Sequence, residues 1–354
     1  MVKKKFKQLQ DKHRKNKLQK AEGPKVPRIT NENVAEHREE ILGGARKYIY
    51  PLQHSKHRIV LLTTTLVIVT ILVFTTACVW LLYRQQTTSP FMYQVTKVLP
   101  FPVARSGNTF IAYENYLFEL RHYIHYYETQ QELSFDTESG QAQLEDYKQR
   151  ALNNVIDLAY IKRLAKENNV TVSEDEVNEQ IRIAREQNRL GSSDEVFEDV
   201  LRNYWNWSVD DFRRSLRSEL LRQNVTRELD QAAQSKAREA LAKLKSGTPF
   251  EEVAKEYSDE EGTAENGGNF GVVNPSNRNV SQQTVDTLFR LNDGEYSDIQ
   301  IVPYETGYAL EIVKNNGTQE NGRDGSHIVV RLKDLGDTLN DMKEQNPYRM
   351  YISQ

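Results

Sequence analysis

The stretch that decides the fold is YSDEEGTAENGGNFG, residues 257–271, in which four glycines stand between a helix pattern and strand patterns. The segment before it, AREALAKLKSGTPFEEVAKEYS (237–258), repeats apolar residues at helical spacing. The segments after it, LFRLNDGEYSD (288–298) and ETGYALEIVKN (305–315), show turn and strand patterns. Because glycine adopts backbone angles that other residues avoid, the cluster predicts a loop that exposes backbone and polar side chains to a ligand.

The residues around this loop predict a small α/β module. Gly247 ends a first helix, and Thr248 followed by Pro249 is typical of the start of a second one. The expected elements are helices at Lys236–Leu244, at about Thr248–Tyr257 and at Val285–Phe289, and strands at Ile299–Val302 and Tyr308–Val313. The glycines are not followed by the lysine and hydroxyl residue of a P-loop, so we expect no nucleotide site.

The order and wording of these segments resemble the parvulin-type (PpiC-type) peptidyl-prolyl isomerases. A parvulin domain normally begins with a strand that carries a histidine, but the matching residues here are Gly325-Ser326-His327-Ile328-Val329-Val330-Arg331, near the other end of the module. The resemblance implies a circularly permuted parvulin-like domain at 236–354, with its first strand supplied by 325–332. A helix at Thr338–Glu344 and an edge strand at Tyr348–Ile352 are then expected. The alternative is a second module cut short after its first strand.

The resemblance also implies the residues of an isomerase site. Its catalytic candidates are His327, Glu260 at the family's Cys or Asp position, and Thr306 at its hydroxyl position. The implied substrate-binding candidates, which would hold the proline ring, are Val280, Thr284, Phe289 and Phe270.

Several positions depart from the family pattern. Val280 and Thr284 stand where the family has Met and Phe, and Ala309 stands where it has a second histidine. Losing a buried aromatic contact costs on the order of 1–3 kcal/mol of binding. Two interpretations therefore stay open: an isomerase, or a parvulin fold that binds polypeptides or serves as a scaffold without turnover.

The region 106–232 predicts a helical domain. Apolar residues recur at helical spacing over Phe110–Tyr127 and Ala151–Asn168. Capping pairs mark three further helix starts, namely Ser173 with Glu176, Ser192 with Glu195 and Ser208 with Asp211. The phrases GNTFIAYENY, VIDLAYIKRLAKENNVTVSEDEVNEQI and YWNWSVDDFRRSLRSELLRQ resemble the N-terminal chaperone domain of SurA-type and PrsA-type extracytoplasmic foldases. Trp205 and Trp207 are expected either in the core or on a polypeptide-binding surface.

The N-terminal part predicts a membrane anchor. Residues 1–58 carry 16 Lys and Arg against 6 Asp and Glu, a net charge of +10, whereas the remainder carries −13. Residues 59–82 contain no charge, which exceeds the ~20 residues that a membrane span needs. The positive-inside rule predicts a cytoplasmic tail at 1–58, a transmembrane signal-anchor helix at 59–83 and the rest outside. Three prolines in 84–105 predict a short stalk without helix.

The sequence as a whole predicts an α+β protein with a single transmembrane helix, an all-helical chaperone domain and a parvulin-like module with a small antiparallel sheet. By resemblance it is an extracytoplasmic folding factor at the plasma membrane, acting on unfolded or proline-containing exported polypeptides. Membrane lipid is the expected partner of 59–83, and we expect no nucleic acid, cofactor or metal. Cys78 is the only cysteine, which excludes an intrachain disulfide. A receptor or envelope structural protein is the remaining alternative.

Overall fold

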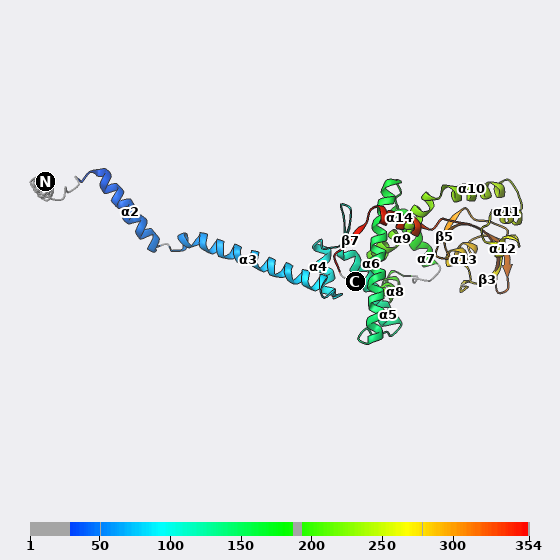
Figure 1. The fold of residues 1–354 in the computed structure, drawn as a ribbon, viewed down its shortest axis with the longest axis horizontal. Coiled ribbons are helices and arrows are strands. Elements are labelled where there is room, and N and C mark those ends of the chain that lie inside the picture. The colour runs from blue at the N-terminus through cyan, green and yellow to red at the C-terminus, as the bar shows by residue number, and fades with distance from the viewer. Residues whose placement is uncertain (1–28, 50, 187–192, 278, 353–354) are drawn as a thin grey trace, which may run out of the picture. The chain divides into compact units, whose positions relative to one another are not determined.

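The computed structural model describes residues 29–49, 51–186, 193–277 and 279–352 (Figure 1). The chain divides into two units, Met1–Ala77 and Cys78–Gln354. In the first unit, helix α2 (Asn31–Ile49) has no buried residue. It precedes α3 (Pro51–Tyr83), which runs on into the second unit. Within the described residues, one helical segment, His57–Tyr83, is long and apolar enough to cross a membrane.

The end of α3 belongs to the core of the second unit. Cys78 and Leu82 are both buried in its largest apolar cluster. The hydroxyl of Tyr113 donates to the carbonyl of Leu82 at 2.7 Å, and the hydroxyl of Tyr83 donates to the carbonyl of Pro102 at 2.6 Å. The apolar helix is therefore joined to the folded part by side-chain packing as well as by the backbone.

The expectation of a helix-free stalk at 84–105 is wrong. Residues Pro90–Val98 form α4, which the side chain of Ser89 caps by accepting from the amide of Met92. Pro90 occupies the first turn, where its missing N–H costs nothing, so a proline read as a helix breaker here starts a helix. Met92, Tyr93 and Thr96 are buried, and the segment packs on the domain instead of spacing it from α3.

The helical domain is built around two apolar clusters. The larger one holds residues of α5 and α6, and the smaller one joins α7, α8 and α9 through Val177, Phe197, Leu201 and Leu220. Trp205 and Trp207 pack half-buried against the smaller cluster, in stacked contact at 5.8 Å. The helices are α5 (Tyr113–Gln130), α6 (Glu138–Glu167), α7 (Glu174–Glu186), α8 (Asp194–Trp205) and α9 (Val209–Leu229).

The predicted helix starts agree with the structure except at two helices, α8 and α5. Ser208 and Asp211 form a complete capping box, and Ser173 and Glu176 exchange the equivalent hydrogen bonds. Helix α8 is capped by Ser193, while Ser192 lies outside the described residues, as do residues 1–28 of the basic tail. Helix α5 begins at Tyr113, later than expected, because Thr109–Ala112 forms a strand.

The domain expected to be all-helical contains a small antiparallel sheet. Its order is β2-β1-β7, made of β1 (Pro102–Ser106), β2 (Thr109–Ala112) and β7 (Tyr348–Met350). Arg105 of β1 lies opposite Arg349 of β7. The edge strand that we expected in the parvulin-like module therefore pairs here instead. Helix α14 (Leu335–Gln345) also packs on this domain, because Leu335 and Leu339 join its core.

The remaining residues form a four-stranded antiparallel sheet with the order β3-β6-β5-β4. Leu310 and Ile312 of β5, with Ile328 and Val330 of β6, pack against α10 and α11 on one face (Figure 1). The alternate positions face the other side, where α13 packs. The elements are α10 (Gln231–Lys245), α11 (Phe250–Tyr257), α12 (Glu261–Ala264), β3 (Asn269–Val273), α13 (Gln282–Leu288), β4 (Gln300–Tyr304), β5 (Gly307–Gln319) and β6 (Gly322–Arg331).

The chain leaves the helical domain before α10 and returns to it after β6. Asp230 forms hydrogen bonds at both crossings. Its carboxylate caps α10 by accepting from the amide of Ala233 at 3.0 Å, and it accepts from the amide of Lys333 on the returning segment at 3.0 Å. Asp230 is 4% exposed. One buried side chain thus fixes where the chain leaves the helical domain and where it returns.

We predict that Asp230→Asn destabilises this junction by about 1–3 kcal/mol. Asparagine preserves the cap on Ala233, but its NH₂ group then faces the N–H of Lys333, leaving a buried donor without an acceptor. Urea unfolding and amide exchange of residues 331–334 measure the effect. Asp334→Asn is the matched control, since Asp334 is exposed and makes only the local cap to Gly336. Equal stability of the two variants would contradict the prediction.

Candidate functional site

The glycine loop brings its backbone directly against the central strand β6. Gly268 has φ +81°, and a Cβ at this position would lie 2.2 Å from the carbonyl oxygen of His327. The amide of His327 donates to the carbonyl of Gly268 at 2.9 Å. Only glycine fits both the backbone angle and the close approach, which explains the GG pair in the stretch that first indicated the fold.

The start of the same loop lies along β6 beyond the end of β3. The amide of Asp259 donates to the carbonyl of Val329 at 2.6 Å, and the amide of Val329 donates to the hydroxyl of Ser258 at 3.1 Å. These bonds fix the backbone just before Glu260, the residue that precedes α12. Its side chain is thereby directed towards His327.

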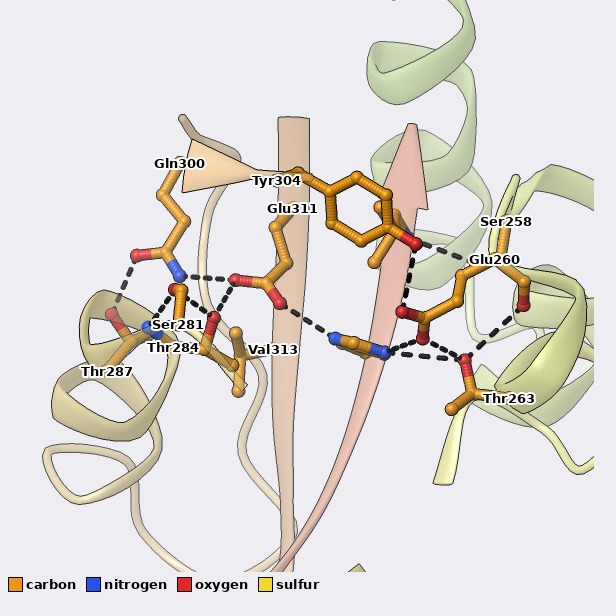
Figure 2. A network of polar contacts seen from close by, with 12 residues as sticks. Ser258, Glu260, Thr263, Ser281, Thr284, Thr287, Gln300, Tyr304, Glu311 and Val313 are labelled. Atoms are coloured by element: carbon orange, nitrogen blue, oxygen red, sulfur yellow. Dashed lines mark hydrogen bonds and ion pairs between the residues drawn. The ribbon is translucent and has the colours of Figure 1, made fainter. Parts of the chain in front are cut away.

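His327 lies between the carboxylates of Glu260 and Glu311, both labelled in Figure 2. Its Nε2 is 2.5 Å from Oε2 of Glu260, and its Nδ1 is 2.8 Å from Oε1 of Glu311 on β5. The side chains of His327 and Glu311 are 5% and 2% exposed, and that of Glu260 is 25% exposed. An ionised carboxylate only accepts hydrogen bonds, so both ring nitrogens donate and the ring is an imidazolium.

The charges of this group perturb one another. Burial by itself lowers the pKa of His327, but the hydrogen bonds to Glu260 and Glu311 outweigh it and raise that pKa to about 9. The hydrogen bond from His327, helped by Thr263 and Tyr304, lowers the pKa of Glu260 to about 2. The ring therefore stays protonated and Glu260 stays ionised throughout the neutral range, so His327 cannot act as a base there.

Neutral donors surround both carboxylates. The hydroxyl of Thr263 donates to Oε2 of Glu260 at 2.5 Å, and that of Tyr304 donates to Oε1 at 3.0 Å. On the other side, Thr284 donates to Oε2 of Glu311 at 2.8 Å, and Gln300 donates to the same oxygen at 2.9 Å. Each carboxylate thus has several donors, as buried charge requires.

An apolar cluster adjoins the ring of His327. The ring of Phe270 meets it edge to face, with centroids 4.8 Å apart. Phe270 packs with Val280 and Phe289 on the buried Leu288 and Val313. Gly325 leaves the space that Phe270 fills, since a Cβ there would lie 2.3 Å from the phenyl ring.

The structure brings together most of the side chains that the sequence singled out, but not all. His327 and Glu260 are in contact, and Phe270, Val280 and Phe289 share the adjoining cluster. Thr284 is 1% exposed and donates to Glu311, so it lies behind the site instead of in its wall.

Thr306 and Ala309 do not join the group around His327. Thr306 is exposed in the turn between β4 and β5. Ala309, at the position of the family's second histidine, is buried between Val302 and Val329.

Sequence reasoning missed Glu311, Thr263 and Tyr304. A signal for Glu311 was present, because alternation along Tyr308–Val313 places it on the same face as Ala309 and Val313, flanked by Leu310 and Ile312. A charge at an inward position of a buried strand is unusual and indicates a partner. Thr263 and Tyr304 carried no comparable signal, since their roles depend on how the loop and β4 meet.

The arrangement supplies a fixed charge pair beside an apolar surface. Within the described ranges, no group of three His, Cys, Asp or Glu side chains is arranged to hold a metal ion. The chemistry that this group supports is hydrogen bonding and electrostatic stabilisation of a bound polar group, with no proton transfer by His327 at neutral pH.

We predict a pH-dependent contribution of His327 to stability. Because its pKa is raised from 6.5 to about 9 on folding, the contribution is complete below about pH 6.5 and is lost as pH rises through about 9. Urea unfolding measures the difference in unfolding free energy between wild type and His327→Gln. This difference should be smaller at about pH 9.5 than at about pH 7, by on the order of 2 kcal/mol.

His122→Gln provides the control for this measurement. Burial lowers the pKa of His122 to about 4, so that ring is neutral when folded at both pH values. The difference in unfolding free energy between His122→Gln and wild type should therefore be the same at both pH values. A constant difference for His327→Gln as well would show that the ring is not held as an imidazolium.

Comparison with known proteins gives two family matches. Residues 52–226 match the SurA-like N-terminal domain, and residues 220–317 match the PPIC-type PPIASE domain. The second match ends before β6, so the strand that carries His327 lies outside it.

Curated relatives include several foldases. Foldase protein PrsA of Geobacillus kaustophilus is 37% identical over 78 residues, which are 22% of this chain and 26% of that protein. Foldase protein PrsA 1 of Lactiplantibacillus plantarum is 28% identical over 123 residues, 34% of this chain and 39% of that protein. The chain thus matches well under half the length of these two relatives.

Among solved structures, the peptidylprolyl isomerase PrsA from Bacillus anthracis is 20% identical, covering 55% of this chain and 86% of that one with a TM-score of 0.18. The assignment rests on the two domain matches and the sequence relatives. The two domain matches and the sequence relatives together support a foldase of the SurA/PrsA type with a parvulin-type domain.

Proposed function

We propose that this chain is a peptidyl-prolyl cis-trans isomerase and chaperone for exported polypeptides. The observation that carries the proposal is the ion pair of Glu260 with His327 beside the apolar cluster of Phe270, at the glycine loop of a PPIC-type domain. The PrsA relatives are named foldase proteins, which supports the same function.

The chemistry of the reaction fits such a site. Rotation of an X–Pro bond meets a barrier of ~18–20 kcal/mol, and no covalent bond is broken. An enzyme lowers this barrier by binding the twisted amide better than the planar one. In our proposal, Phe270, Val280 and Phe289 contact the proline ring, and the polar group of Glu260 and His327 stabilises the twisted amide.

We also propose that the parvulin-like domain is circularly permuted. Strand β6, which carries the histidine pattern, lies between β3 and β5 in the interior of the sheet. Ten residue pairs join β5 and β6, with one irregularity between Asn315 and Gly317, and they place Leu310 opposite Val330 and Val313 opposite His327. A truncated second module, the alternative, would not need its strand inside the first module's sheet.

For the rest of the chain we propose a membrane-anchored arrangement. The apolar helix at 59–83 spans the plasma membrane once, contacting lipid, with the basic tail 1–58 in the cytoplasm and residues from 84 onward outside. The charge asymmetry and the candidate span His57–Tyr83 support it. The helical domain, whose aromatic side chains include Trp205 and Trp207, then handles unfolded exported chains.

Specific features favour a second candidate, a parvulin fold without turnover that acts as a chaperone or envelope scaffold. Thr284 gives its hydroxyl to Glu311, and Ala309 is enclosed by apolar neighbours. Neither supplies the aromatic or histidine side chain that the family pattern has there. An activity measurement separates the two candidates.

We predict measurable isomerase activity of the full chain in detergent micelles, assayed by protease-coupled cleavage of a proline tetrapeptide. The full chain is used because Cys78 and Leu82 belong to the folded core. Glu260→Gln should lower kcat/KM roughly tenfold or more, since the fixed carboxylate is lost. Glu256→Gln, an exposed acid on α11 paired with Lys243, is the control. A wild-type rate equal to the uncatalysed one would leave the non-catalytic candidate.

The proposed topology predicts the accessibility of engineered cysteines. In a Cys78→Ala background, Ser276→Cys on the exposed loop after β3 should react with a membrane-impermeant maleimide in intact cells. Lys5→Cys in the basic tail should react only after lysis. Labelling of Lys5→Cys in intact cells would contradict the orientation.

A further inference from the structure

We propose that Glu311 is a positioning residue of the isomerase site, which fixes the ring of His327 and through it the carboxylate of Glu260. The proposal rests on the proposed isomerase function. Glu311 is not a catalytic residue in our proposal, because its side chain is 2% exposed and contacts the opposite ring nitrogen of His327 from the more exposed Glu260.

The strand register places the two side chains on one face of the sheet. Glu311 lies opposite Val329, and His327 lies opposite Val313, so Glu311 and His327 are diagonal neighbours across β5 and β6. Their distance of 2.8 Å follows from this pairing. The rigid interior of the sheet, not a loop, therefore sets the position of Nδ1.

Glu311 is itself held on its far side. Its other oxygen accepts from Thr284 on α13 and from Gln300 on β4, and Gln300 in turn accepts from Thr287 at 2.6 Å. These donors come from two elements that pack next to β5. A carboxylate fixed by two neutral donors and one cation cannot follow the ring if His327 rotates.

This geometry restricts His327 to one orientation. A histidine ring with one bonded nitrogen can turn about its Cβ–Cγ bond and exchange partners. Here both nitrogens are engaged, Nδ1 by Glu311 and Nε2 by Glu260, and Phe270 packs on the ring. Glu260 is thereby kept in a single position at the exposed end of the network, where a substrate amide is expected to bind.

The charges around His327 also support a positioning role for Glu311. One imidazolium faces two carboxylates, so the group carries one net negative charge. The other charged groups nearby are paired elsewhere: Arg331 packs over the ring of Tyr304 and pairs with Glu305, and Lys236 pairs with Asp259. Removing the charge of Glu311 leaves His327 with one carboxylate in a buried site, which weakens proton binding by the ring.

Glu311 lies close to the position at which the family pattern has its second histidine. The family pattern places that histidine at Ala309, and Glu311 follows two residues later on the same face of β5. In this chain the polar partner of His327 on β5 is thus an acid, two residues along the strand from Ala309. An acid enforces the protonated ring, whereas a neutral histidine would leave the tautomer open.

The test compares Glu311→Gln with wild type by two measurements on the full chain in detergent micelles. Histidine labelled in the ring with ¹³C and ¹⁵N reports the titration of His327, whose signal among the seven histidines is identified with His327→Gln. We expect Glu311→Gln to weaken proton binding by His327 about tenfold or more. In parallel, kcat/KM of wild type should be level between about pH 6 and 8, while that of Glu311→Gln should fall as pH rises through this range.

Asp286→Asn is the matched control. Asp286 is also a buried acid, 5% exposed, on α13, and it accepts a hydrogen bond from Gln282 of the same helix. This variant makes the same change of carboxylate to amide and should leave both the His327 titration and the pH profile unchanged. An equal shift in Asp286→Asn would overturn the proposal, because the effect would then reflect general loss of packing.

A folded Glu311→Gln protein with the wild-type titration of His327 would likewise overturn the proposal. If Glu311→Gln does not fold, Glu311→Asp decides, because it keeps the charge but withdraws the carboxylate by one methylene. A smaller shift of the same sign supports the proposal, and no shift overturns it. The two proposals can fail separately. If wild type is inactive but Glu311→Gln still shows the expected shift in the His327 titration, the isomerase function is wrong and the positioning of His327 by Glu311 is supported.

Discussion

The contact on which the sheet domain depends is the protonated ring of His327 held between Glu260 and Glu311. Each member comes from a different segment: the ring from β6, one carboxylate from the glycine loop and the other from β5. A buried cation needs its partners, and removing one typically costs far more than an exposed ion pair contributes. The position of the loop, the register of β5 and β6 and the site are therefore coupled.

Parts of this arrangement were predictable from sequence because they follow from backbone requirements. The GG pair indicated a loop with unusual angles, and Gly268 does have positive φ and touches β6. The pattern around His327 indicated a buried strand. Glu311 was missed because its meaning depends on which residue lies diagonally across the sheet, which no local pattern states. Tyr304 was missed for the same reason.

The errors outside the site have a common physical origin. Pro90 was read as a helix breaker, but with Ser89 as cap it begins α4. The strand expected at Tyr348–Ile352 forms over Tyr348–Met350, yet its partner is β1, far away in sequence. At β7 the local sequence predicts the observed strand, and at Pro90 it predicts a break in the chain that the helix start replaces. Tertiary packing, through buried Met92 and the contact of β7 with β1, decided the outcome.

The late position of β6 has a consequence for how the site forms. Strand β3 pairs only with β6, so it has no partner until the last strand of the sheet is available. Strands β4, β5 and β6 are joined by short connections, and such local hairpins form before distant pairings. We therefore expect His327 and Glu311 to meet early in folding, within the β5–β6 hairpin.

Glu260 and Gly268, which precede this meander, reach it only when β3 and α11 pack on β6. Until then the imidazolium has one carboxylate and lies open to water on its Nε2 side. Docking of the glycine loop supplies the second carboxylate, that of Glu260. We therefore expect the charge pair that we assign to the substrate site to form late in folding, after the β5–β6 hairpin.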